Sequence, residues 1–85
     1  MAIKVQLYTL STCGWCQKTK RFLEEHHVEY EYEDVDLLVG EAKEKVKTEV
    51  CRHNPRLSYP TMVIDDGREV VVGYDEDRMR QLLGL

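Results

Sequence analysis

The stretch Thr12-Cys13-Gly14-Trp15-Cys16 places two cysteines two residues apart at a polar turn. An apolar run precedes it at residues 3–10, and an amphipathic run follows it at residues 17–27. The start of the chain enters a strand-like pattern at once, so we expect no signal peptide. In a chain without a signal peptide, two cysteines between a strand and a helix are typical of a redox-active pair and not of a structural disulfide.

Length and composition indicate one soluble domain over residues 1–85. The chain is 42% hydrophobic and 33% charged, which is ordinary for a globular protein. No apolar run approaches the roughly 20 residues that a membrane span needs, so we expect no membrane partner. We predict a cytoplasmic location, where thiols are kept reduced and three cysteines do not form a disulfide scaffold.

The charge pattern argues against nucleic acid, because the formal net charge is −4 and phosphate binding needs a basic face. Residues 24–36 carry seven carboxylates and no Lys or Arg, which we interpret as a solvated face. Lys18, Lys20 and Arg21 follow the cysteine pair directly. We expect cations so close to a thiol to favour its thiolate form.

Hydrophobic periodicity predicts the order β-α-β-α-β-β-α, an α/β class. A strand from residue 3 and a helix over about 13–26 lead into a second strand over 28–33. A helix over about 36–53 follows, and its predicted apolar stripe is Val39, Ala42, Val46 and Val50. The turn Asp65-Asp66-Gly67-Arg68 predicts a tight hairpin between strands at 61–64 and 69–72. Asp75 is a good N-cap for a last helix that turns Met79, Leu82 and Leu83 inward.

The two cysteines are predicted to have unequal roles, because only a thiolate attacks a disulfide. Cys13 falls at the helix start, where unpaired N–H groups and the helix dipole stabilise negative charge. Cys16 falls on the apolar side of the helix, where a thiol is less exposed and less acidic. Cys13 is therefore the candidate nucleophile and Cys16 the resolving thiol, while Trp15 offers a flat contact surface to whatever docks.

Zinc binding is the main alternative for the cysteine pair, with Cys51 and His53 as two further ligands. Residues two apart on a helix point about 200° away from each other, which makes convergence of Cys51 and His53 difficult. We therefore predict no metal site. Cys51 lies about 100° from Val50, off the apolar stripe of its helix, and we interpret it as a partly exposed bystander.

Four segments in register resemble the glutaredoxin family of the thioredoxin-like superfamily, over nearly the whole chain. They are Leu7-Tyr8-Thr9 leading into Cys13-Gly14-Trp15-Cys16, the second strand from Val28, Ser58-Tyr59-Pro60-Thr61, and Val72-Gly73-Tyr74-Asp75-Glu76. The resemblance implies a four-stranded mixed sheet flanked by three helices. It also implies a thiol–disulfide oxidoreductase that reduces protein disulfides or glutathione mixed disulfides.

The same resemblance implies binding residues around the cysteines. A cis bond before Pro60 would place the Tyr59 backbone beside a bound peptide or glutathione. Gly73, Asp75 and Glu76 would match the positions that hold the γ-glutamyl end of glutathione. Thr12 and Trp15 complete the predicted set of substrate-binding residues. We also expect no bound cofactor, and we expect the protein to be a monomer.

Three positions depart from the family pattern and leave the reductant open. Leu10 stands where the family commonly has a Lys, Val72 replaces the first Gly of a Gly-Gly pair, and Gly-Trp replaces Pro-Tyr between the cysteines. Reduction by thioredoxin reductase, with electron donation to ribonucleotide reductase or a similar protein, is therefore an alternative to glutathione. A [2Fe–2S] cluster carrier is a second alternative, because a motif without Pro is compatible with cluster binding.

Overall fold

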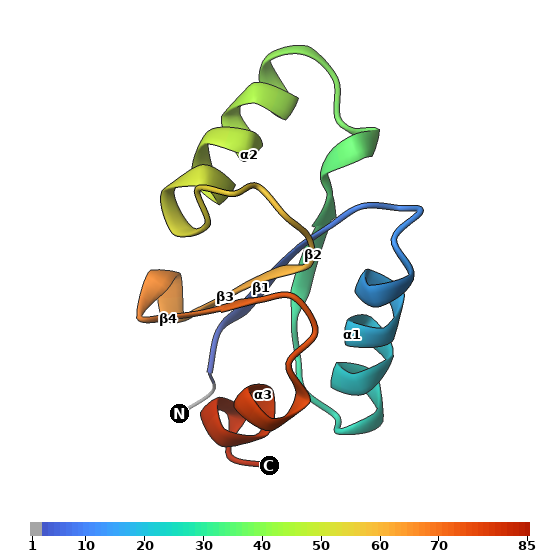
Figure 1. Cartoon of the computed structure of the whole chain (residues 1–85), viewed down its shortest axis with the longest axis vertical. Coiled ribbons are helices and arrows are strands. Elements are labelled where there is room, and N and C mark those ends of the chain that lie inside the picture. Colours follow the sequence, from blue (N-terminus) through green and yellow to red (C-terminus); the bar gives the residue numbers. More distant parts are fainter. Residues whose placement is uncertain (1–2) are drawn as a thin grey trace.

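The computed structural model describes residues 3–85, which form a four-stranded sheet of order β2-β1-β3-β4 (Figure 1). The strands are β1 (Val5–Thr9), β2 (Glu31–Asp34), β3 (Thr61–Ile64) and β4 (Glu69–Val72). β1 pairs with β2 in parallel and with β3 antiparallel, and β3 pairs with β4 antiparallel. The predicted mixed sheet and element order are confirmed.

Two helices share the main core face of the sheet. They are α1 (Gly14–Glu25) and α3 (Glu76–Leu83). Val5, Leu7 and Thr9 alternate inward along β1, which is the period that a half-buried strand requires. Phe22 and Leu23 of α1, Met79 of α3 and the inward residues of the strands form one buried cluster. The core therefore fixes the start of α1 directly beyond the end of β1.

The helix α2 (Gly40–His53) lies apart from α1 and α3, and only its C-terminal end comes near the sheet (Figure 1). The predicted start at residue 36 is wrong, because a short 3-10 turn, η1 (Val35–Leu37), intervenes and Gly40 begins α2 with a φ of +60°. Val39 is consequently 80% exposed and Ala42 is exposed, while Val50 is fully buried. The predicted apolar stripe is wrong for its first half, because that half reaches beyond the sheet.

Two other predicted boundaries can be compared with the structure. β2 begins at Glu31 and not at residue 28, since the pairing with β1 starts at Gln6 and Glu31. The hairpin between β3 and β4 is confirmed, with the 3-10 turn η2 (Asp65–Gly67) at its tip.

Within residues 3–85 no helix combines the length and apolar composition needed to cross a membrane.

Candidate active site

Cys13 is the N-cap of α1, in the loop that joins the end of β1 to that helix. Its backbone is extended, and its Sγ accepts a hydrogen bond from the backbone N–H of Cys16 at 3.2 Å. A helix start presents backbone N–H groups without partners inside the helix, and the Cys13 sulfur accepts a hydrogen bond from one of them. Cys13 is half-buried as a residue.

Cys16 lies one turn further along α1 and is fully buried in the core. Burial, and then a side-chain hydrogen bond between the Cys16 thiol and Cys13, raise the pKa of the Cys16 thiol to about 12. Cys16 therefore stays a thiol at neutral pH. Cys16 is buried and Cys13 is half-buried, which agrees with the predicted difference in exposure between the two cysteines.

A nearly buried ion pair lies beside Cys16 and was not anticipated from the sequence. Lys20 Nζ is 3.3 Å from Asp34 Oδ1, and the two side chains are only 12% and 17% exposed. The Thr9 hydroxyl donates to the same Asp34 oxygen at 2.5 Å, and Lys20 also lies 3.9 Å from the centre of the Tyr32 ring. The charge of Lys20 opposes the rise in the pKa of Cys16. The sequence signal that could have placed Lys20 beside Cys16 is their spacing of four residues, which puts both side chains on one face of the helix.

A groove of about 230 Å³ is lined by Trp15, which lies two residues after Cys13, and by Tyr59, Pro60, Gly73 and Tyr74. The Tyr59–Pro60 bond is cis, as the resemblance implied. The Pro60 carbonyl accepts from the Gly73 N–H at 2.8 Å, which ties the two loops together. Trp15 is 60% exposed and stacks on Tyr74 with ring centroids 5.8 Å apart. Four of the predicted site residues thus share one aromatic groove.

The remaining predicted residues lie around this groove without lining it. Asp75 caps α3, since its carboxylate accepts from the Arg78 N–H at 3.1 Å. Glu76 accepts from the Tyr74 hydroxyl at 3.1 Å, and Thr12 is exposed in the turn before Cys13. The structure places both residues at the start of α3, where Asp75 caps the helix and Glu76 lies in its first turn.

Comparisons with known proteins agree with this geometry. The glutaredoxin family model matches residues 5–70. The chain belongs to the glutaredoxin family. Methanoredoxin of Methanosarcina acetivorans is similar in structure, with a TM-score of 0.91 and 43% identity over 96% of this chain and 85% of that one. The glutaredoxin of Methanosarcina mazei Go1 has a TM-score of 0.89 and 44% identity, over 96% and 79% of the two chains.

One curated protein matches this glutaredoxin domain over part of its own length. It is described as a probable maleylacetoacetate isomerase of Caenorhabditis elegans and is 43% identical over 58 residues. The match covers 68% of this chain and 24% of the isomerase, so this chain spans about a quarter of that relative.

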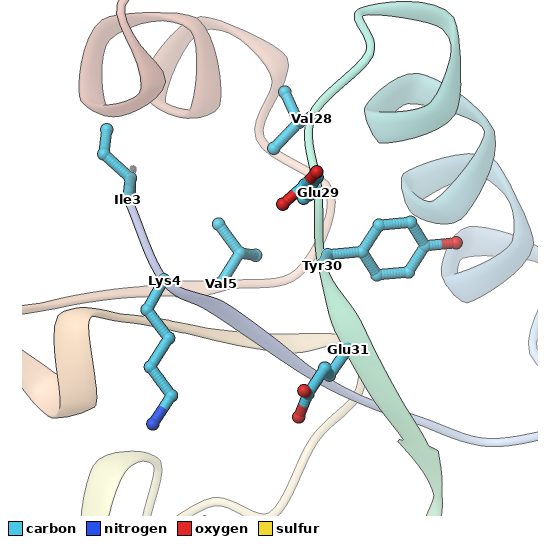
Figure 2. Close-up of a pocket in the computed structure, with 7 residues that line it drawn as sticks. All are labelled: Ile3, Lys4, Val5, Val28, Glu29, Tyr30 and Glu31. Atoms are coloured by element: carbon cyan, nitrogen blue, oxygen red, sulfur yellow. The ribbon is translucent and has the colours of Figure 1, made fainter. Parts of the chain in front are cut away.

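A wider hollow in this glutaredoxin has a volume of about 640 Å³ (Figure 2). It is bordered by the start of β1 and by the segment that leads into β2, whereas Cys13 follows the opposite end of β1. Tyr30 points from this segment toward α1, where its hydroxyl donates to Glu24. None of the seven lining residues is a Cys or a His, so we assign the hollow no part in thiol chemistry.

Within residues 3–85, no group of three or more His, Cys, Asp or Glu side chains is placed to hold a metal ion. Cys51 is exposed on α2 and does not join the cysteine pair, as its position off the apolar stripe predicted.

Proposed function

We propose that this glutaredoxin is a thiol–disulfide oxidoreductase that reduces protein disulfides or glutathione mixed disulfides. Family and fold support thiol–disulfide exchange as the general activity. The observation that carries the specific roles is the contrast between the two cysteines. Cys13 caps a helix and is half-buried, whereas Cys16 is buried with a pKa of about 12.

The proposed reaction has two exchange steps. The Cys13 thiolate attacks one sulfur of the substrate disulfide, the substrate S–S bond breaks, and the departing thiolate takes up a proton. Cys16 then loses its proton and attacks Cys13 Sγ, which releases the second substrate sulfur as a thiol. Two electrons have passed to the substrate, and the protein holds a Cys13–Cys16 disulfide. A thiol reductant restores the dithiol by the same exchange in reverse.

The high pKa of Cys16 gives this order a physical reason. A thiol that remains protonated cannot compete with Cys13 for the substrate disulfide. Once the mixed disulfide forms, Cys16 is held one helical turn away, so its attack is intramolecular and is favoured by proximity. We propose that the departing substrate thiolate, or water, accepts the Cys16 proton.

Substrate binding is proposed to use the aromatic groove. The cis Tyr59–Pro60 segment and Gly73 would lie along an extended substrate backbone, with Trp15 as a contact surface. Asp75 and Glu76 would interact with a cationic group of the substrate, and Thr12 would lie at the edge near Cys13. We propose a monomer in the cytoplasm.

The reductant is either glutathione or thioredoxin reductase, and two coupled assays separate them. A model disulfide is reduced in one cuvette with glutathione and glutathione reductase, and in a second with thioredoxin reductase. Activity in the second cuvette alone would refute glutathione dependence. Cys13→Ser should abolish turnover in both, and activity that survives this change would overturn the assignment of the nucleophile.

A further inference from the structure

Lys18 lies at the rim of the aromatic groove. Its ammonium nitrogen is 5.2 Å from the centre of the Trp15 ring and 5.0 Å from the centre of the Tyr74 ring. Both rings line the groove and stack on each other. A cation within about 6 Å of an aromatic ring centre is attracted by the ring. Two rings therefore hold the Lys18 charge at the groove although the residue is exposed.

Several other charged side chains near the groove already have partners, although Glu25, whose charge also acts on Tyr74, is not among them. Glu76 accepts from the Tyr74 hydroxyl and lies 3.7 Å from Arg80 Nε. Asp75 is engaged at the cap of α3, and Lys20 is paired with Asp34. Lys18 forms no ion pair with any carboxylate in the part of the chain that the structure describes. Its charge is thus available to an anion in the groove.

We propose that Lys18 binds a carboxylate of the substrate, so that the groove favours disulfides that carry an anionic group close to the reacting sulfur. The inference rests on the proposed function and names the substrate class of the same site. An ammonium is a compact charge with three donors, which suits a carboxylate in several orientations. The two rings beneath it limit the freedom that an exposed lysine would lose on binding.

The test measures single-turnover rates of the reduced protein with three small disulfides. Dithiodipropionate is anionic, bis-hydroxyethyl disulfide is neutral and cystamine is cationic. Each reaction converts the protein dithiol and one disulfide into a protein disulfide and two thiols, so no external reductant is needed. The leaving thiols differ in pKa, and the quantity compared is therefore the anionic-to-neutral rate ratio of each variant divided by that of the wild type.

Lys18→Gln should lower this ratio roughly two- to fivefold, as expected for an exposed ion pair, and added salt should lower the wild-type ratio in the same direction. Lys18→Glu should lower it further and favour cystamine, while Lys18→Arg should retain it. Lys45→Gln, which removes the same charge from the exposed face of α2, should leave the ratio unchanged.

Two results would overturn the inference alone. One is a ratio that Lys18→Gln and Lys18→Glu leave unchanged, and the other is an equal loss of rate for all three probes, which would make Lys18 a structural residue. A wild type that reacts with none of the probes would instead refute the proposed function, and the inference with it.

Discussion

The ion pair between Lys20 and Asp34 gives the sharpest test of how the core supports the cysteines. Asp34 accepts from both Lys20 Nζ and the Thr9 hydroxyl, and only 17% of its side chain is exposed. Asp34→Asn keeps an oxygen for Thr9 but removes the charge that balances Lys20. The variant therefore isolates the electrostatic part of the interaction.

The size of the effect follows from the burial of the pair. Removing one partner of a fully buried pair costs about 3–5 kcal/mol, because the other charge remains without compensation. Here 12% of Lys20 and 17% of Asp34 remain exposed, so water reaches both charges. We expect Asp34→Asn to lower the free energy of unfolding by about 2–3 kcal/mol. This corresponds to a fall in melting temperature of about 8–24 °C for a domain of this size.

Urea unfolding followed by far-UV circular dichroism measures this loss, with Lys45→Met on the exposed face of α2 as the control for removing a charge. Lys20→Met should cost less, and the double variant Lys20→Met/Asp34→Asn should lose about 1–3 kcal/mol less than the sum of the two single variants. Lys20→Met should also slow closure of the Cys13–Cys16 disulfide, because the charge that opposes the rise in the Cys16 pKa is gone. A loss below about 0.5 kcal/mol for Asp34→Asn, the level of an ordinary surface change, would refute the reasoning.

Three further predictions concern the cysteines and the turns. Cys16→Ser should stop the reaction at a mixed disulfide on Cys13, and intact-protein mass spectrometry that finds no such adduct would contradict the proposed order. The free energy of unfolding of the reduced protein should fall as the pH rises above about 9. The Cys16 thiol keeps its proton up to about pH 12 in the folded protein, whereas in the unfolded chain it ionises at its ordinary pKa of 9.0. The contribution of Cys16 to this fall is at most about 1.4 kcal/mol per pH unit. Melting curves between about pH 8 and pH 10 check this, and Cys16→Ala should flatten the slope; an equal slope in both proteins would assign the effect to other groups. Gly67→Ala should lower the stability of the protein more than Gly84→Ala. Both glycines have a positive φ, but a Cβ at Gly67 would also lie 2.8 Å from His53 Cε1. His53→Ala should therefore restore part of the stability lost in Gly67→Ala, as measured in thermal melts.

Local patterns predicted the regular elements well where burial and sequence agree. The alternation of Val5 and Leu7 predicts β1, and Asp75 predicts the start of α3, because each signal depends only on neighbouring residues. The start of α2 was mispredicted because Val39 fits a helical stripe in sequence yet has no surface to pack against. Periodicity states which residues share a face and not whether that face meets the core.

The sequence by itself determined where Cys13 and Cys16 lie on α1. Two thiols spaced by one helical turn at a helix start are placed by local geometry, so a half-buried cysteine and a fully buried one follow from the pattern alone. Tertiary structure alone decided the surroundings of that pair. Trp15 shares a groove with Tyr59 and Tyr74, and Lys20 pairs with Asp34, only because the fold brings together segments that are far apart in the chain. No local signal encodes such contacts, since they depend on strand order and on how the core is packed.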